Sequence, residues 1–296
     1  MRRLLVLGVA AAFSALLGIV SAPAADQPEI SGPPASAAPP PVPAPSLRAP
    51  APAPRRSTRQ TEEDAATYDK CMKLAKDDPA AARDAAEHWQ GRGGAHPADH
   101  CYAVALVGLK QYKDGAARLE KLAQAMIHAP ASLRAEVLGQ AAQAWLLAGD
   151  PGRAYAADGE ALKLHPDSVE LMIDRAEAAG DAGWFDKAVT DLDRVLKLDP
   201  NRVEALIYRA SAYRELNKLD PALADIDKAV GLAPNSVPAL LERGDIRRLK
   251  GDVNGARKDW VRVSELAPGS AADDAAKTNI ERLELKEDAA PPVKPR

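Results

Sequence analysis

A chain of 296 residues with 46% hydrophobic content can bury a sizeable core, and only 4% of its residues are aromatic. Alanine is the most frequent hydrophobic residue, which favours closely packed helices over sheet. The formal net charge is −3 with both signs interspersed, so the chain lacks the basic stripe that nucleic-acid binding requires, and nucleic acid is not an expected partner.

Residues 1–24 have the pattern of a signal peptide. Arg2 and Arg3 precede an uncharged stretch from Leu4 to Val20, and Ala22-Pro23-Ala24 supplies the small-x-small pattern that a signal peptidase reads. We predict cleavage after Ala24, and the alternative is an uncleaved inner-membrane anchor, because the apolar stretch is at the short limit for a membrane span. In both cases the rest of the chain is expected outside the cytoplasm, in a bacterial periplasm.

Residues 25–60 are predicted to be a disordered Pro/Ala-rich linker. The segment 26–56 contains 11 prolines mixed with alanine and serine, a composition that cannot bury a core and prefers an extended path.

The sequence from residue 135 onward repeats with a period of 34 residues. The proline that closes each unit is Pro166, Pro200, Pro234 or Pro268. Position 8 of the units is Ala142, Ala176, Ala210 and Gly244, position 20 is Ala154, Ala188, Ala222 and Ala256, and position 30 is Leu164, Leu198, Leu232 and Leu266. Each unit is predicted to form two helices joined by a short polar turn, because small residues let paired helices approach closely and the proline ends the second helix.

These columns resemble the tetratricopeptide-repeat (TPR) family, whose unit has small residues at positions 8, 20 and 27 and a proline at position 32. The resemblance covers units 135–168, 169–202, 203–236 and 237–270. The chain departs from the fullest pattern in lacking tryptophan at position 4, and Asp158 stands at position 24 of the first unit. The resemblance implies an all-α superhelix that binds another polypeptide on its concave face and has neither a cofactor nor an enzymatic activity.

Looser units flank these four. With Tyr112 aligned to position 17, residues 96–134 form a degenerate repeat that has Ala103 at position 8, Gly115 at 20, Leu119 at 24 and Leu122 at 27. Residues 61–95 are predicted to be a helical hairpin, either a divergent repeat or a cap. Residues 271–287 form an amphipathic capping helix, and residues 288–296 form a flexible tail. The predicted fold is thus an all-α solenoid of about five to six repeats.

Two cysteines, Cys71 and Cys101, are candidates for a disulfide, because thiols in an oxidising compartment tend to pair. Two buried thiols, or a redox or metal role, are the alternatives.

One recurrent pair of charges is predicted to be structural. Arg175, Arg209 and Arg243 occupy position 7, and Asp191, Asp225 and Asp259 occupy position 23 of the same units. The unit with Ala141 at position 7 has alanine at position 23 as well, so the two charges occur together and predict an ion pair within or between hairpins.

The inner face, lined by the first helix of each unit, is the predicted partner-binding surface. At 100° per residue, positions 2, 5, 9, 12 and 13 lie opposite the core positions. The candidate residues are Glu136, Gln143, Glu170, Ile173, Glu177, Glu204, Ile207, Ser211, Arg214, Leu241, Asp245 and Arg248. This groove is predicted to be apolar with acidic edges.

Family members that hold a partner's C-terminal carboxylate have Lys or Arg at position 5 and Asn at position 9, and neither occurs here. We therefore expect a protein or peptide that offers apolar anchors and basic side chains. The alternative is that Ile173, Ile207 and Leu241 only pack between neighbouring first helices.

A metal-binding or enzymatic protein is the rival hypothesis. His96 and His100 are spaced to share a metal on one helix face, near His88, Asp99 and Cys101. No phosphate loop, nucleophile elbow or paired carboxylate supports catalysis. A third hypothesis is an envelope-structural role through self-association.

Overall fold

The computed structural model describes residues 58–288, and α1 to α13 belong to one compact unit that begins at Thr58. The predicted all-α fold is confirmed, because every regular element in this part of the chain is a helix. The predicted signal peptide, nearly all of the predicted linker and the tail after Asp288 lie outside the described residues. None of the described helices is both long and apolar enough to span a bilayer.

The helices pair into hairpins in chain order. They are α1 (Thr58–Asp77), α2 (Pro79–Gln90), α3 (Ala95–Gly108), α4 (Tyr112–Ala125), α5 (Ala131–Leu147), α6 (Pro151–Leu164), α7 (Val169–Asp181), α8 (Phe185–Leu198), α9 (Val203–Glu215), α10 (Leu219–Leu232), α11 (Val237–Leu249), α12 (Val253–Leu266) and α13 (Ala271–Asp288). In each unit from α5 to α12 the second helix begins at position 17, and α4 begins at Tyr112, the residue aligned to position 17. The hairpins therefore follow the 34-residue register.

The turn inside each hairpin from α5 to α12 is closed by a residue in the left-handed region. Gly149, Gly183 and Gly251 have φ of 74°, 76° and 86°, and Asn217 takes the same place with φ of 57°. Glycine and asparagine tolerate this conformation best, and it ends the first helix. The second helix then begins under a side-chain cap in two of the units, where Asp150 and Asp252 accept hydrogen bonds from backbone N–H groups at 3.1 and 2.9 Å.

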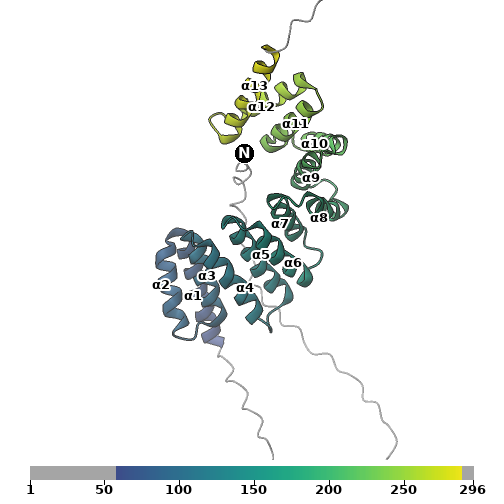
Figure 1. Cartoon of the computed structure of the whole chain (residues 1–296). Coiled ribbons are helices and arrows are strands. Elements are labelled where there is room, and N and C mark those ends of the chain that lie inside the picture. Colours follow the sequence, from purple (N-terminus) through teal and green to yellow (C-terminus); the bar gives the residue numbers. More distant parts are fainter. Residues whose placement is uncertain (1–57, 289–296) are drawn as a thin grey trace, which may run out of the picture. The chain divides into compact units, whose positions relative to one another are not determined.

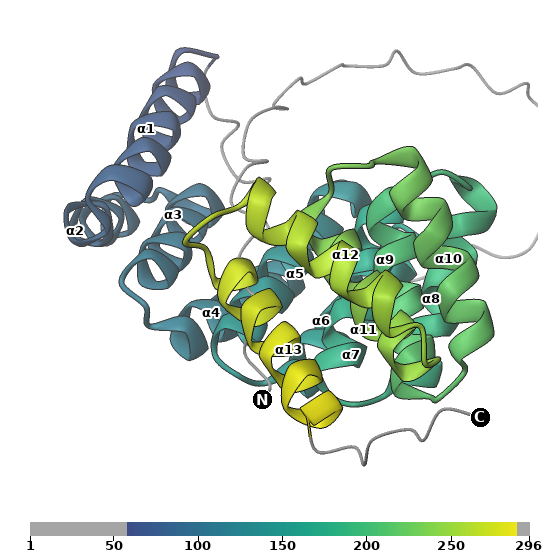
Figure 2. The same ribbon diagram turned by 90° about the horizontal axis from the view of Figure 1, so that it is seen from above.

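Figure 1 shows the hairpins following one another, with α5, α7, α9 and α11 on the inner side of the curve and α6, α8 and α10 on the outer side. Successive first helices pack directly on one another, from α5 on α7 to α11 on α13, as expected of helices on an inner side. Seen from above in Figure 2, α1 and α2 lie at the N-terminal end, and α13 lies alongside α12. The inner face is therefore built from one helix of each repeat.

The predicted Arg–Asp pairs are confirmed within each hairpin. Arg175 Nε donates to Asp191 Oδ2 at 2.8 Å, and the Arg209–Asp225 and Arg243–Asp259 bonds are 2.7 and 3.0 Å. All three aspartates are buried, so the pairs are more than surface ion pairs. Removal of one partner would leave an uncompensated buried charge, which typically costs about 3–5 kcal/mol.

Each of the last two arginines also reaches back to the preceding repeat. Arg209 Nη1 donates to Asp193 at 2.8 Å, and Arg243 Nη1 donates to Asp227 at 3.3 Å. Asp193 and Asp227 both stand at position 25. Position 7 therefore ties successive hairpins together, which the sequence columns did not reveal.

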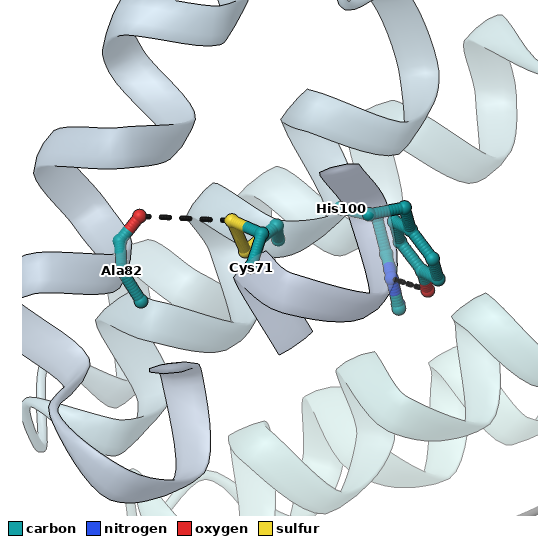
Figure 3. The surroundings of a disulfide bond; sticks show 5 residues. Cys71, Ala82 and His100 are labelled. Atoms are coloured by element: carbon teal, nitrogen blue, oxygen red, sulfur yellow. Dashed lines mark hydrogen bonds between the residues drawn. A yellow bond between two sulfur atoms is a disulfide. The ribbon is translucent and has the colours of Figure 1, made fainter. Parts of the chain in front are cut away.

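Cys71 of α1 and Cys101 of α3 form a disulfide, with 6.1 Å between their Cα atoms (Figure 3). Both side chains are buried. The covalent link holds the N-terminal helix against the hairpin of α3 and α4.

Candidate functional site

The structure places most of the predicted partner-binding residues on the first helices with side chains open to solvent. Glu136, Gln143 and Glu170 are exposed. The half-buried residues are Glu177, Glu204, Ile207, Ser211, Arg214, Leu241, Asp245 and Arg248. The remaining residue, Ile173, is only 3% exposed.

Position 5 differs from the expected surface position. Ile173 belongs to the core cluster that continues from α7 into α5 and α8, so its side chain offers no surface to a partner. Ile207 and Leu241 are half-buried and pack against the next core cluster. The alternative, that these residues pack between neighbouring first helices, therefore describes Ile173, and the inner face is less apolar than predicted.

Position 6, which is absent from the predicted set, is half-buried in every unit from α5 to α11 and carries polar side chains. In α7 the acidic residues Glu170, Asp174, Glu177 and Asp181 stand at positions 2, 6, 9 and 13, and we name these four residues the α7 stripe. Residues spaced by four, three and four positions lie on one side of a helix. The uninterrupted acidic spacing in this helix is the signal that could have identified position 6.

The environment of the α7 stripe disfavours negative charge. The pKa of Asp174 is raised to about 6, mainly by burial; a hydrogen bond from Gln143 Nε2 at 3.5 Å opposes the rise, and Glu204 and Glu170 contribute to it. Burial, followed by Asp174, Asp181 and Glu204, raises the pKa of Glu177 to about 7. These carboxylates repel one another in a partly desolvated groove.

Tyr208 of α9 lies among the same carboxylates. Burial raises the pKa of its phenol, and Glu177, Glu204, Asp174 and Asp181 raise it further in that order. A tyrosine of the next repeat is therefore within electrostatic range of the stripe.

In the C-terminal half of the inner face, Arg214, Glu242 and Asp245 are engaged by protein partners. Arg214 Nε of α9 donates to Glu242 Oε1 of α11 at 2.6 Å, and Asn279 Nδ2 of α13 donates to Asp245 Oδ1 at 2.9 Å. Burial raises the pKa of Asp245, whereas Arg214, Arg248 and the bond from Asn279 lower it. Of the predicted site residues, Arg214 and Asp245 are thus engaged within the solenoid.

A comparison of equivalent positions explains this difference between the two halves. Glu242 stands at position 6 of α11, and its cation, Arg214, stands at position 12 of the preceding first helix. Asp174 stands at position 6 of α7, where the equivalent residue of the preceding helix is Leu146. Among the described residues, neither Asp174 nor Glu177 has a cation within ion-pair distance. Arg202 lies at the rim, 3.9 Å from Glu170 and 3.5 Å from Glu204.

His100, one of the histidines proposed as metal ligands, is bonded within the protein. His100 lies between α1 and α5, with Tyr68 Oη 2.7 Å from its Nδ1 and Gln140 Oε1 2.6 Å from its Nε2. Figure 3 shows His100 close to the disulfide. Burial lowers the pKa of His100, and both ring nitrogens are occupied by protein groups. Within residues 58–288, no group of three or more His, Cys, Asp or Glu side chains has an arrangement that could hold a metal ion.

Comparison with known proteins identifies the fold. Residues 203–236 match the family described as tetratricopeptide repeat. No curated protein sequence matches the chain significantly.

Solved structures with a similar fold include MamA residues 41 to the end from Desulfovibrio magneticus RS-1, with a TM-score of 0.52 and 20% identity over 59% of this chain and 97% of that chain. A MamA RS-1 double mutant matches with a TM-score of 0.51 and 20% identity over 58% of this chain and 93% of that one. TTC0263, a thermophilic TPR protein of Thermus thermophilus, matches with a TM-score of 0.49 and 17% identity over 64% and 100% of the two chains. At such identities the likeness shows the fold alone. The fold of the described residues is therefore the all-α tetratricopeptide-repeat superhelix, and residues 203–236 are the unit that carries the family match.

Proposed function

We propose that this protein is a non-catalytic interaction module or assembly scaffold that holds a partner polypeptide along its inner face. Superhelical repeat proteins present extended inner surfaces of this kind, so the proposal rests on the fold and on the chemistry of one surface. The observation that carries it is the α7 stripe, whose carboxylates are crowded together without an internal cation at Asp174 and Glu177.

The chemistry of the stripe favours a partner segment with arginine or lysine side chains. A guanidinium or ammonium group beside Asp174 and Glu177 would relieve their mutual repulsion and lower their pKa values. Arg214 beside Glu242 is an example of the same contact within the solenoid. Charge-assisted hydrogen bonds in a partly desolvated groove are stronger than those on an open surface. Apolar anchors of the partner would meet Ile207 and Leu241, which are only partly available.

We also propose that the protein acts in the periplasm. The support is the predicted signal peptide in residues 1–24, together with a buried disulfide between Cys71 and Cys101 that suits an oxidising compartment. N-terminal sequencing of the protein isolated from cell envelopes tests cleavage after Ala24.

A labelled peptide of alternating arginine and leucine tests the stripe by fluorescence anisotropy. We expect Asp174→Asn combined with Glu177→Gln to weaken binding by about tenfold or more, equivalent to about 1.4 kcal/mol, at a pH of about 8 where both carboxyl groups are ionised. Each substitution keeps the size of the side chain and removes only its charge. Added salt should weaken binding to the native protein more than binding to the variant.

The matched control is Glu160→Gln on α6, an exposed carboxylate outside the groove whose loss should leave the affinity unchanged. Equal affinities of the native protein and the double variant would refute the proposal. A peptide with glutamate in place of arginine that binds equally well would refute it too.

A further inference from the structure

Asp158 occupies a core position that a large apolar side chain fills in each of the other repeats. At position 24 the other repeats have Leu119, Leu192, Ile226 and Trp260, all buried. Asp158 is 0% exposed, and neither of its carboxyl oxygens has a hydrogen-bond partner among the described residues. A buried polar group without a hydrogen bond is costly, and a buried charge is costlier still.

Asp158 stands at position 24, one residue before the aspartate that occupies position 25 in the next two repeats, Asp193 and Asp227. Arg209 and Arg243 donate through Nη1 to the aspartate at position 25 of the preceding repeat. At the junction of α6 and α7 the residue at position 25 is Gly159, and a Cβ there would lie 3.9 Å from Arg175 Nη1. Arg175 therefore lacks the partner that the later arginines have, while a carboxyl group lies in the core beside it.

We propose that the junction between α6 and α7 is a proton-controlled release point of the superhelix, packed while the Asp158 carboxyl is protonated and opened locally when it ionises. The inference rests on the fold and is independent of the proposed partner. The junction is coupled to the α7 stripe, because Asp174 is one of the charged groups that act on Asp158 and also accepts a hydrogen bond from Gln143 of α5.

The direction of the pH effect follows from the groups around Asp158. The pKa of Asp158 is raised to about 9, mainly by burial and next by Asp174; Arg175 opposes the rise, and Asp191 and Glu177 contribute smaller increases. These groups come from α7 and α8, and α5, which also packs on α6, contributes no charged group to the set. Because the folded pKa exceeds the unfolded value of 3.8, the stability from this group is present at low pH and is lost as pH rises from about 4 to about 9.

Native-state hydrogen exchange of the full chain tests the proposal. Protection factors, corrected for intrinsic exchange, are measured for amides of α6 and α7 and for those of α9 and α10 as internal reference. Between pH of about 5 and about 8, we expect protection of α6 and α7 to fall about tenfold or more relative to the reference, since each unit of pH above the unfolded pKa shifts the balance by up to about tenfold.

Two variants separate titration from packing. Asp158→Asn keeps the polar side chain but cannot ionise, so the fall in relative protection of α6 and α7 should shrink to the smaller part that Asp174, Glu177 and Asp181 contribute through their own raised pKa values. Asp158→Leu combined with Gly159→Asp restores the arrangement of the later repeats, and it should raise protection of α6 and α7 at every pH. A wild-type pH dependence in Asp158→Asn, or a pH-independent native protein, would overturn the proposal.

Discussion

At the scale of single residues, the side chains at positions 8 and 24 of a repeat are matched in volume. The repeats with Leu192 and Ile226 at position 24 have alanine at position 8, Ala176 and Ala210. The repeat with the larger Trp260 at position 24 has Gly244 at position 8. A Cβ on Gly244 would lie 2.7 Å from Trp260 Cδ1 and closer still to Nε1. The glycine of the last full repeat is thus needed for the close approach of the indole.

The first prediction concerns this pair. Gly244→Ala should destabilise the protein by about 1–3 kcal/mol, because overpacking in a well-packed core outweighs the helix propensity gained from alanine, which is worth about 1 kcal/mol. Chemical denaturation monitored by circular dichroism measures the effect.

The control for this prediction is the same substitution in a Trp260→Leu background. There the added methyl group has space, and Gly244→Ala should increase stability relative to Trp260→Leu alone. A stabilising effect of Gly244→Ala in the native background would show that position 24 does not limit position 8.

At the scale of elements, the N-terminal helix depends on a covalent link and a buried polar contact. The Cys71–Cys101 disulfide joins α1 to α3, and His100 joins both to α5 through Tyr68 and Gln140. Position 7 supplies the corresponding ties in the later repeats through arginine and aspartate. The two ends of the described chain are thus held by different chemistry.

The second prediction concerns the disulfide. Replacement of both cysteines by alanine should lower the free energy of unfolding by about 2–4 kcal/mol, the typical effect of a cross-link that closes a loop of this size. The effect should appear first in α1, as faster proteolysis ahead of the repeats that begin at α5.

Thermal melts with and without reductant check this prediction. The native protein should lose stability in reductant after equilibration near its unfolding midpoint, whereas the double alanine variant should not respond. A native protein whose α1 is equally protected with and without reductant would contradict the role of the cross-link.

At the scale of the whole molecule, each hairpin is stabilised by its neighbours, and the last hairpin is covered by α13. Ala276 and Leu283 of α13 are buried in one cluster with Leu240 and Trp260. The residues of α13 on its other side, such as Asp274, Lys277 and Glu281, are exposed and polar. This asymmetry is what the open end of a solenoid requires.

The third prediction is that truncation after Pro268 uncovers this cluster. Loss of α13 should lower the free energy of unfolding by about 3 kcal/mol or more, since burial of one leucine side chain alone is worth about 1.5–3 kcal/mol. The shortened protein should also self-associate, which light scattering over a concentration series measures.

Truncation after residue 288 is the control, because it leaves α13 intact, and it should change neither stability nor association. An unaltered melting temperature in the protein shortened after Pro268 would show that α13 does not cap the solenoid.

The repeat, the hairpins and the Arg–Asp pairs could be read from the sequence. They depend on contacts that recur every 34 residues, so each column reports the same packing several times. The start of α5 at Ala131 was harder to predict, because the extra residues around Pro130 belong to one junction and appear in no column. The contacts from position 7 to position 25 do recur, in Arg209–Asp193 and Arg243–Asp227, but they join different repeats, and a column shows which residues recur without showing which repeat each one contacts.

Only the tertiary structure decided which side chains form the inner surface. Helical periodicity relates the residues of one helix to one another at 100° per residue, but the rotation of that helix in the stack is set by its neighbours. A small rotation therefore buries Ile173 and presents Asp174 in its place. Packing also decides that Glu242 is paired with Arg214 whereas Asp174 has no cation beside it. It encloses Asp158 in a core position without a hydrogen-bond partner. Each outcome depends on the residues that the adjacent repeat contributes.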